Sequence, residues 1–368
     1  MSQQNTVLKF PKDDSGFYEQ LKQEVNTLVT HNRHRNAVKF LWIKLFFYST
    51  LFAISYSLLF IIDYSDHSYL LIGNYSVIGM AGILLAFNAS HDAVHNTFSK
   101  KKYINHFIYN ITFNLQGVSG YLWRIRHKAS HHVFPNVDGC DADIDNNALI
   151  KLSPTHKHFW WHRYQHIYAT FLYVFYTLHW IFIKDFIYLR KKSLANLKNQ
   201  KHSSYKIISV IVWKLFYLFY MIVAPILFMD YELSHVLVSF FIMHGFISVF
   251  FVLTLIISHL CMETKFPTPD KNGVLPYGYH RHQLEVSMDY IPTSVMANWV
   301  FGGFNSHSAH HLFSSLPHTL YMKITPLIKE IALQYGYTYN ELNLVKAIGS
   351  HYCYLKKLGA NTCHHTAI

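Results

Sequence analysis

Four long runs of apolar residues dominate the chain, and each is long enough to cross a lipid bilayer. A transmembrane helix needs about 20 mostly apolar residues, and each run reaches that length with few charged positions. The runs form two closely spaced pairs on either side of a long polar stretch: 41–62 with 69–90, and 207–229 with 233–259. This pattern predicts an all-α integral membrane protein with four transmembrane helices in two hairpins.

A fifth apolar run, 166–184, is ambiguous until the charges beside it are considered. The turns at 63–68 and 229–232 contain acids but no Lys or Arg, which places them outside by the positive-inside rule. Basic residues lie on both sides of the fifth run: Lys100, Lys101, Lys102, Arg124, Arg126 and Lys128 before it, and Arg190, Lys191, Lys192, Lys198 and Lys201 after it. We therefore expect this run to be interfacial or re-entrant, with both termini cytosolic.

No internal repeat, Pro-rich linker or low-complexity segment divides the chain, so one domain, 1–368, is expected. Within the N-terminal part, Phe17, Leu21, Val25 and Leu28 recur at helical spacing. This spacing predicts an amphipathic helix on the membrane or on the protein's own cap, although an ordinary surface helix fits as well. The segments are an amphipathic N-terminus (1–40), a first span pair (41–90), a cytosolic region (91–206), a second span pair (207–259) and a cytosolic end (260–368).

Composition supports a protein that is partly in lipid and partly in water. Charged residues make up 14% of the chain, against roughly 25% in soluble domains. The mean hydropathy of +0.11 is nevertheless too low for a chain made only of spans. The net charge of +12 is typical of basic cytoplasmic loops, so a nucleic acid is not an expected partner. The four cysteines show no CxxC spacing and are expected to be reduced thiols.

Histidine is unusually frequent, with 27 residues, and eight of them form three clusters on the predicted cytosolic side. Residues three or four apart share one face of an α-helix, so each cluster is expected to aim its rings at a common point. His132 lies roughly 100° further round the helix, where it can reach a second ion. The three sets that share a face are His91 with His95, His127 with His131, and His307 with His310 and His311.

Scattered surface histidines and a metal-storage tract are the alternatives, but helical spacing in three clusters argues against both. Eight imidazoles are too many for one four-coordinate zinc and suit two ions of higher coordination number. Imidazole binds zinc, copper, iron and nickel, so the ligand type alone does not name the metal. No serine nucleophile elbow, P-loop or dinucleotide-binding fingerprint competes for the chemistry.

The order HxxxH, HxxxHH, HxxHH resembles the histidine boxes of the membrane fatty acid desaturases. The flanking sequences HDAVHNTFSK, GYLWRIRHKASHHVFPNVDGCDADID, RYQHIYA and GGFNSHSAHHLF are similar to the bacterial acyl-CoA and acyl-lipid branch, which is related to front-end desaturases. The resemblance covers roughly residues 40–335 and implies a non-haem pair of irons. It also implies the activity: an acyl-CoA or acyl-lipid chain would gain a cis double bond, with dioxygen and two external electrons consumed.

The implied chemistry is physically coherent. An unactivated methylene has no acidic proton, so acid–base catalysis cannot start the reaction. The metal and dioxygen would supply the chemistry, while the protein positions the chain, excludes water and tunes the metals. We therefore expect an apolar tunnel for the acyl chain beneath a cytosolic metal site.

The resemblance also implies a ninth ligand at the cytosolic end of the last span. His259 lies 24 residues after His235, which is about 36 Å along a helix and places it beside the boxes. His244 falls near mid-span and is expected to be a core histidine. Some desaturases carry an asparagine one turn before the ninth ligand, and Leu255 stands at that position here.

Acidic and basic residues near the boxes suggest supporting roles. Ligating histidines usually donate their second ring N–H to a carboxylate or a carbonyl, and the candidates for this role are Asp92, Glu285 and Asp289. Basic residues beside the second box are candidates for binding the phosphate of a CoA or phospholipid head group, although they fit a purely topological role equally well. They are Arg124, Arg126 and Lys128.

The chain also departs from the front-end pattern. Those enzymes usually begin the third box with glutamine, where this chain has His307, and many carry a His-Pro-Gly-Gly haem motif that is missing here. A separate ferredoxin-like or cytochrome-like electron donor with its reductase is therefore implied. The expected location is a bacterial inner membrane, with lipid as a partner and the active site facing the cytosol.

Two other functions remain compatible with the sequence. A di-iron fatty acyl, alkane or carotenoid hydroxylase would use the same core and differ only in the fate of the carbon radical. A divalent-metal transporter would place its ligands near the bilayer midplane, whereas these clusters fall at cytosolic helix ends.

Overall fold

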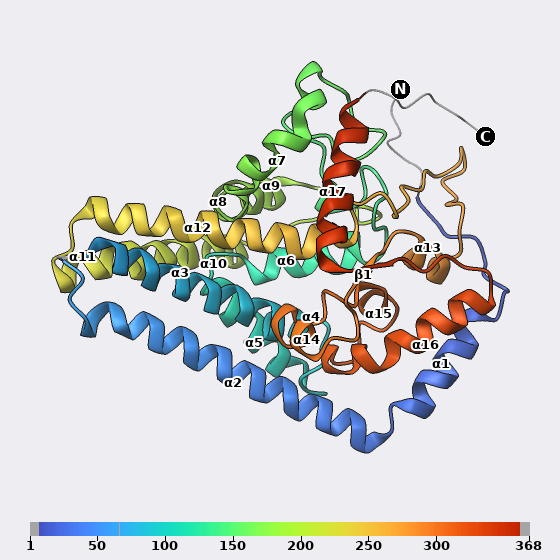
Figure 1. The fold of residues 1–368 in the computed structure, drawn as a ribbon, viewed down its shortest axis with the longest axis horizontal. Coiled ribbons are helices and arrows are strands. Elements are labelled where there is room, and N and C mark those ends of the chain that lie inside the picture. The colour runs from blue at the N-terminus through green and yellow to red at the C-terminus, as the bar shows by residue number, and fades with distance from the viewer. Residues whose placement is uncertain (1–6, 66, 361–368) are drawn as a thin grey trace.

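Long helices packed side by side form one half of the protein, and shorter helices form a cap at one end of them (Figure 1). The computed structural model describes residues 7–65 and 67–360. Four helices in this part of the chain are long and apolar enough to cross a membrane: His31–Ile61, Ser68–Val94, Ser204–Met229 and Leu233–Ser258. Their number and approximate positions agree with the prediction from the apolar runs.

Three of the four long helices change their winding near one end. α3 (Ser68–Leu85) continues through a π-helical turn, Ala86–Ser90, into α4 (His91–Val94). α10 (Ser204–Leu218) continues in the same way through Phe219–Val223 into α11 (Ala224–Met229), and α12 (Leu233–Leu255) ends in a 3₁₀ turn at Ile256–Ser258. Extra-wide π turns are often found at functional sites, and the one after α3 leads directly into the first histidine box.

The first long helix, α2 (His31–Ile61), begins earlier than the hydrophobic pattern predicted. The predicted start was 41, but the Thr30 side chain accepts a hydrogen bond from the Arg33 N–H and caps the helix ten residues sooner. The polar first turns of α2 carry no hydrophobic signal, so the apolar run marks only the later part of this helix.

The N-terminal helix α1 (Phe17–Leu28) packs on the cap. Its buried Phe17, Leu21 and Val25 join one apolar cluster with Ile324 and Ile328 of α16 (Tyr321–Gln334), and Figure 1 shows the two helices side by side. Of the two predicted surfaces for this helix, the protein's own cap is correct, and the apolar stripe is not free to lie on a membrane.

The fifth apolar run is not one straight helix. It consists of two helical runs, Trp160–Tyr173 and Tyr176–Arg190, that meet at a bend of 76°. The first run contains α7 (Gln165–Tyr173), and the second contains α8 (Tyr176–His179), a π turn at Trp180–Lys184 and α9 (Asp185–Arg190). At the bend, the Thr177 N–H donates to the Ser248 hydroxyl of α12 at 3.0 Å, which ties the bend to the last long helix.

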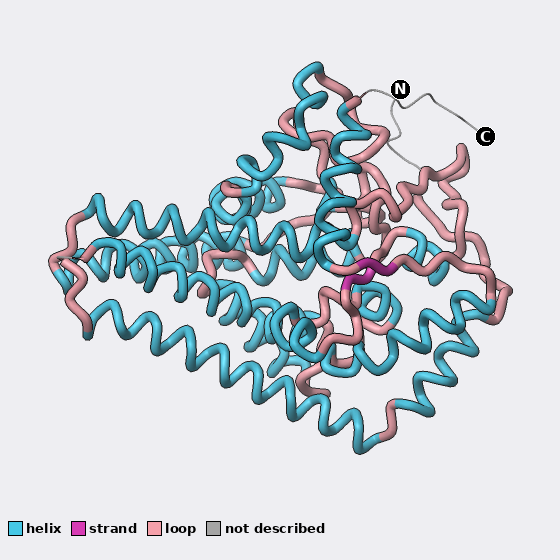
Figure 2. Tube along the Cα trace, in the orientation of Figure 1, coloured by secondary structure: helices cyan, strands magenta, loops and turns pink. Residues whose placement is uncertain are grey.

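The cap consists of helices joined by long loops, and Figure 2 shows its only pair of short strands among the described residues. Strand β1 (Asp289–Tyr290) pairs in parallel with β2 (Glu341–Leu342), with Asp289 opposite Glu341. The remaining helices are α5 (Lys102–Asn114), α6 (Gly120–Arg126), α13 (Tyr279–Glu285), α14 (Val295–Phe301), α15 (His307–Leu312) and α17 (Leu344–Gly359).

Candidate metal centre

The first histidine box lies where the second long helix enters the cap. His91 and His95 follow the π turn at Ala86–Ser90, and both side chains are buried. His91 Nε2 lies 3.1 Å from His310 Nε2, and His95 Nε2 lies 3.0 Å from His127 Nε2. The first box therefore meets one histidine of the second box and one of the third.

The second box does not have the α-helical geometry that its spacing predicted. Residues His127–His131 form a π-helical turn, in which the His132 N–H donates to the His127 carbonyl at 2.9 Å. The wider turn aligns residues five apart, so His127 Nε2 lies 2.9 Å from His132 Nε2. The prediction that the rings of His127 and His131 meet at one point, with His132 turned away, was therefore wrong. His132 meets His127, and His131 faces a second set of histidines.

The third box, on α15, is divided between two groups. His307 and His311 are one α-helical turn apart, and their Nε2 atoms lie 3.2 Å from each other. His310 points the other way, toward His91. The expectation that all three rings of this box meet at one point was wrong, because the side chains of residues 310 and 311 project about 100° apart around the helix.

The histidines form two adjacent groups whose ring nitrogens lie within 4.8 Å of one another in each group. Every member is at most 7% exposed. Among the described residues, no histidine outside the nine expected ligands joins either group. The five-histidine group is His91, His95, His127, His132 and His310, and the four-histidine group is His131, His259, His307 and His311.

Contacts on the outer ring nitrogens orient two rings of the four-histidine group. His259 Nδ1 lies 2.8 Å from the Val286 carbonyl, and His131 Nδ1 lies 3.1 Å from Asp141 Oδ1. A carbonyl only accepts, so His259 Nδ1 carries the proton and its Nε2 presents a lone pair to the group. His259 Nε2 lies 2.6 Å from His307 Nε2. These outer contacts are the kind that fix a metal-binding tautomer.

Burial keeps most of the rings neutral, which is the form that binds a metal. Burial and neighbouring histidines hold the pKa of each of five rings well below the usual value: His127, His132, His307, His310 and His311. Burial also lowers the pKa of His259 to about 3. His131 is the exception, because Asp141 and Asp143 outweigh the effect of its burial and raise its pKa to about 9.

The donor set fits a pair of metal ions. Nine buried nitrogen donors in two adjacent groups match ions of intermediate softness with five or six ligands better than one tetrahedral zinc. Asp141 and Asp143 lie against His131 and bring negative charge that offsets the charge of a bound cation. A cation at this group would take the place of the His131 proton.

The three acids expected to hold ligand rings have other partners. Asp92 accepts from His318 Nδ1 at 2.5 Å, and Glu285 lies 2.8 Å from Lys265 Nζ. Asp289 accepts from the Ser308 N–H at 2.8 Å, at the start of α15. Within residues 7–65 and 67–360, none of the three bonds to a ring of the two groups, so this prediction was wrong. Asp289 instead orients the third box through its backbone.

A buried chain of polar residues that the sequence did not indicate lies beside the first box. Lys44 of α2 lies 2.7 Å from His318 Nε2, and His318 donates to Asp92. Lys44 also donates to the Asn298 carbonyl at 3.0 Å. These contacts join the first long helix to α14, to the turn before α16 and, through His318, to the first box. Neither Lys44 nor His318 belongs to a spaced motif in the sequence. The one signal for this buried contact was the position of Lys44, a charged residue inside an apolar run.

The predicted head-group residues lie in different environments. Arg126 is 3% exposed, and its guanidinium stacks over the rings of Trp180 and Tyr188 at 4.8 and 4.9 Å. It is therefore packed inside the protein and does not present its charge to solvent, contrary to the prediction. Arg124 and Lys128 are half-buried, and burial together with Arg124 lowers the pKa of Lys128.

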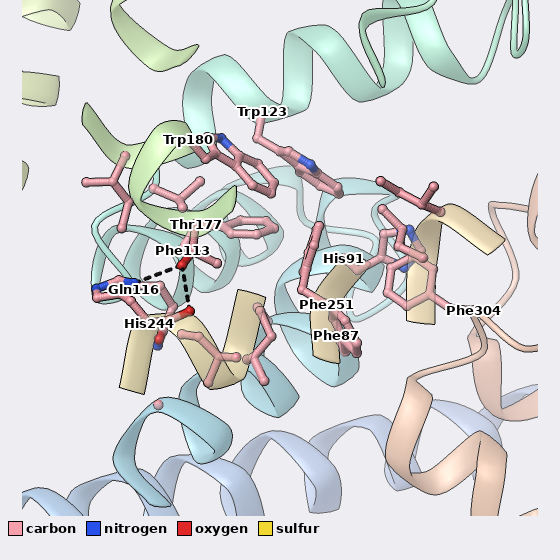
Figure 3. Close-up of a pocket in the computed structure, with 18 of the residues that line it drawn as sticks. Phe87, His91, Phe113, Gln116, Trp123, Thr177, Trp180, His244, Phe251 and Phe304 are labelled. Carbon is pink, nitrogen blue, oxygen red and sulfur yellow. Dashed lines mark hydrogen bonds between the residues drawn. The ribbon is translucent and has the colours of Figure 1, made fainter. Parts of the chain in front are cut away.

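An apolar cavity leads from the two groups into the bundle of long helices (Figure 3). At the end beside the two histidine groups, the cavity is lined by His91, His127, His131, His259 and His307. Figure 3 shows His244, Thr177 and Gln116 together, away from His91. His244 and His259 are 15 residues apart (259 − 244), or about 22 Å of helix. The walls between are mainly apolar: Phe87, Phe113, Trp123, Trp180, Met243, Ile247, Phe251 and Phe304.

Comparison with known proteins identifies relatives over most of the chain. A family model described as "Fatty acid desaturase" matches residues 68–343. The chain is 28% identical to "sn-1 linoleoyl-lipid 6-desaturase" of Arthrospira platensis over 288 residues, which is 77% of each chain. It is 27% identical to the protein of the same name from Synechocystis sp., over 77% of this chain and 79% of that one. It is 28% identical to "Acyl-lipid (8-3)-desaturase B" of Dictyostelium discoideum, over 76% of this chain and 62% of that one.

Proposed function

The chain belongs to the fatty acid desaturase family, and from this premise we propose that it introduces a cis double bond into the acyl chain of a membrane lipid. One observation carries the proposal: two groups of buried histidines open onto the end of a long apolar cavity. An acyl chain fits that shape and chemistry. A hydroxylase on the same core is less well supported, because the named relatives are desaturases.

Iron is the proposed metal, with one ion in each histidine group. A bound pair of irons, together with dioxygen, would supply the oxidising power that unactivated C–H bonds require. The balanced reaction removes two hydrogens from adjacent carbons and reduces dioxygen to two waters with two electrons and two protons. All nine proposed ligands would be neutral imidazoles when bound, and Asp141 and Asp143 beside His131 would offset part of the charge of the bound ions.

The residues of the chain bind and orient the substrate. Apolar side chains on α3, α6 and α12 surround the cavity, so the acyl chain of a membrane lipid exchanges the apolar interior of the bilayer for equally apolar contacts. The same walls exclude water from the reacting methylenes. The outer contacts of His131 and His259 hold the ligand rings in place, so that the geometry at the head of the cavity stays rigid.

An acyl-lipid is favoured over an acyl-CoA as the substrate. The two cyanobacterial relatives and the Dictyostelium relative are named as enzymes of lipid-linked acyl chains. Expression in a bacterium of defined lipid composition should yield fatty acids lighter by the mass of two hydrogens. A gain of one oxygen atom as the main product would favour the hydroxylase.

Turnover by the purified protein is expected to require a separate electron donor. The two electrons have to come from a ferredoxin-like or cytochrome-like protein with its reductase, because the sequence has no recognised flavin, nicotinamide or haem motif. In detergent or nanodiscs with acyl-lipid and dioxygen alone, we expect no product, and addition of ferredoxin with its reductase should restore turnover. Turnover driven by NAD(P)H without any added protein would contradict this.

We also propose that the chain is a single integral domain in a bacterial inner membrane, with the metal groups and both termini on the cytosolic side. The acid-containing turns at 63–68 and 229–232 and the basic 184–206 loop support this orientation. Single cysteines at Ser65 and Lys198, in a background whose native cysteines are serines, should react with membrane-impermeant reagents from opposite sides. Labelling from the same side would mean that the bent pair Trp160–Tyr173 and Tyr176–Arg190 crosses the membrane.

A further inference from the structure

Two aromatic rings flank the metal groups at the head of the cavity. The Trp123 indole stacks on the ring of His127 with centroids 4.2 Å apart and an angle of 16°, and it lies 5.8 Å from the ring of His91. The ring of Phe304 lies 4.4 Å from His91. All four residues line the cavity, so an acyl chain that reaches the metal groups has to pass these rings.

The Trp123 side chain packs directly against a proposed metal ligand. It lies one helical turn before His127, at the point where α6 runs into the π turn of the second box. The ring of Phe113 of α5 also packs against the indole, with centroids 4.6 Å apart. A rigid ring held between a ligand and a supporting helix has few accessible rotamers, so its position relative to His127 is well defined.

Other aromatic residues continue the wall more deeply. Figure 3 shows Trp123 on the helix along one side of the cavity, and Phe87 and Phe251 on helices along the other. The rings of Phe87 and Phe304 lie 4.8 Å apart, and those of Phe87 and Phe251 lie 5.6 Å apart. The space for an acyl chain at the metal groups is therefore bounded by rings on opposite sides.

We propose that Trp123 is a positioning residue that selects which two methylenes are oxidised and keeps the reaction on the path to a double bond. This inference rests on the proposed desaturase function and deepens it. Removing the second hydrogen requires the adjacent carbon to stay in place after the first C–H bond is broken. Hydroxylation instead puts one atom of dioxygen into a C–H bond and releases the other as water, with the same two electrons and two protons. A chain that can shift against the metal groups loses this discrimination.

The test compares W123L with W123F in cells and as purified protein. In W123L, turnover should fall on the order of 10²-fold, the cost that a misplacement of about 1 Å can impose. The remaining product should be a mixture, with double bonds at neighbouring positions and some hydroxylated chain. W123F keeps an aromatic ring and should retain mainly the wild-type position. Iron content should stay at the wild-type level in both variants.

W180L is the matched control, because Trp180 lines the same cavity but makes edge contacts with the rings of Phe251 and Tyr176. A lower rate in W180L is compatible with the proposal, but its double bond should stay at the wild-type position. An unchanged product position in W123L, or loss of iron from it, would overturn the role of Trp123. Absence of any double bond from the wild-type protein would instead refute the proposed function, so the two failures are distinguishable.

Discussion

Replacing His127 with alanine is expected to abolish turnover and to lower bound iron. His127 Nε2 lies 2.9 Å from His132 Nε2 and 3.0 Å from His95 Nε2, so its loss removes a central donor of the five-histidine group. The same result is expected for alanine at any other box histidine: His91, His95, His131, His132, His307, His310 or His311. Iron analysis of purified variants and fatty acid analysis of expressing cells measure the two effects.

A graded comparison separates a ligand from its support. Asp141→Asn weakens the hold on His131 but leaves every ring in place, and loss of such an outer partner typically costs about 10–100-fold in metal affinity or activity. The alanine variants should lose more than this. His31 is exposed at the start of α2, and H31A should behave like the wild-type protein. Full iron and activity in several of the box variants would refute the di-iron centre.

Alanine variants of His259 and His244 can be compared directly, because both are buried histidines of the last long helix and its extension. His259→Ala should lose iron and activity, since His259 Nε2 lies 2.6 Å from His307 Nε2 and 3.2 Å from His311 Nε2. His244→Ala should keep its iron. The ring of His244 lies 2.8 Å from the Thr177 hydroxyl and 2.7 Å from the Tyr217 hydroxyl, and it is far from both metal groups.

The expected cost of His244→Ala is in stability. Its loss leaves the buried Tyr217 hydroxyl without its partner ring, and an unsatisfied buried group costs about 1–3 kcal/mol, whereas the Thr177 hydroxyl keeps its contact with the Ser248 hydroxyl at 2.6 Å. Thermal unfolding in detergent should therefore occur at a lower temperature than for the wild-type protein, with the metal content unchanged. Equal iron loss in both variants would contradict the assignment of His259 as the ninth metal ligand.

The family and the ligand candidates were accessible from the sequence because they depend on local patterns. Apolar length predicted four candidate spans, and the comparisons confirm the desaturase family that the three boxes indicated. The nine singled-out histidines are also the nine that meet in space. His259 came into this set through its distance along a helix, which is a local property, together with the family resemblance.

The division of those histidines between two groups was decided only by the tertiary structure. The prediction from the spacing of the histidines assumed α-helices. The π turn at His127–His131 instead places His132 beside His127, and His131 faces His259. A π turn is stabilised by the packing around it and not by residue preference, so spacing alone does not reveal it. His310 similarly joins His91 across the cap.

The partners of the carboxylates were also outside the reach of the sequence. Asp92, Glu285 and Asp289 lie near the boxes along the chain, yet they bond to His318, Lys265 and Ser308. A hydrogen bond depends on distances of about 3 Å and on direction, whereas position along the chain limits a side chain only to a region. The sequence by itself therefore determined which histidines are available to bind metal ions and in which segments of the chain they lie. Only the packing of those helices decided which ring faces which, because long-range contacts set the relative rotation and depth of each helix.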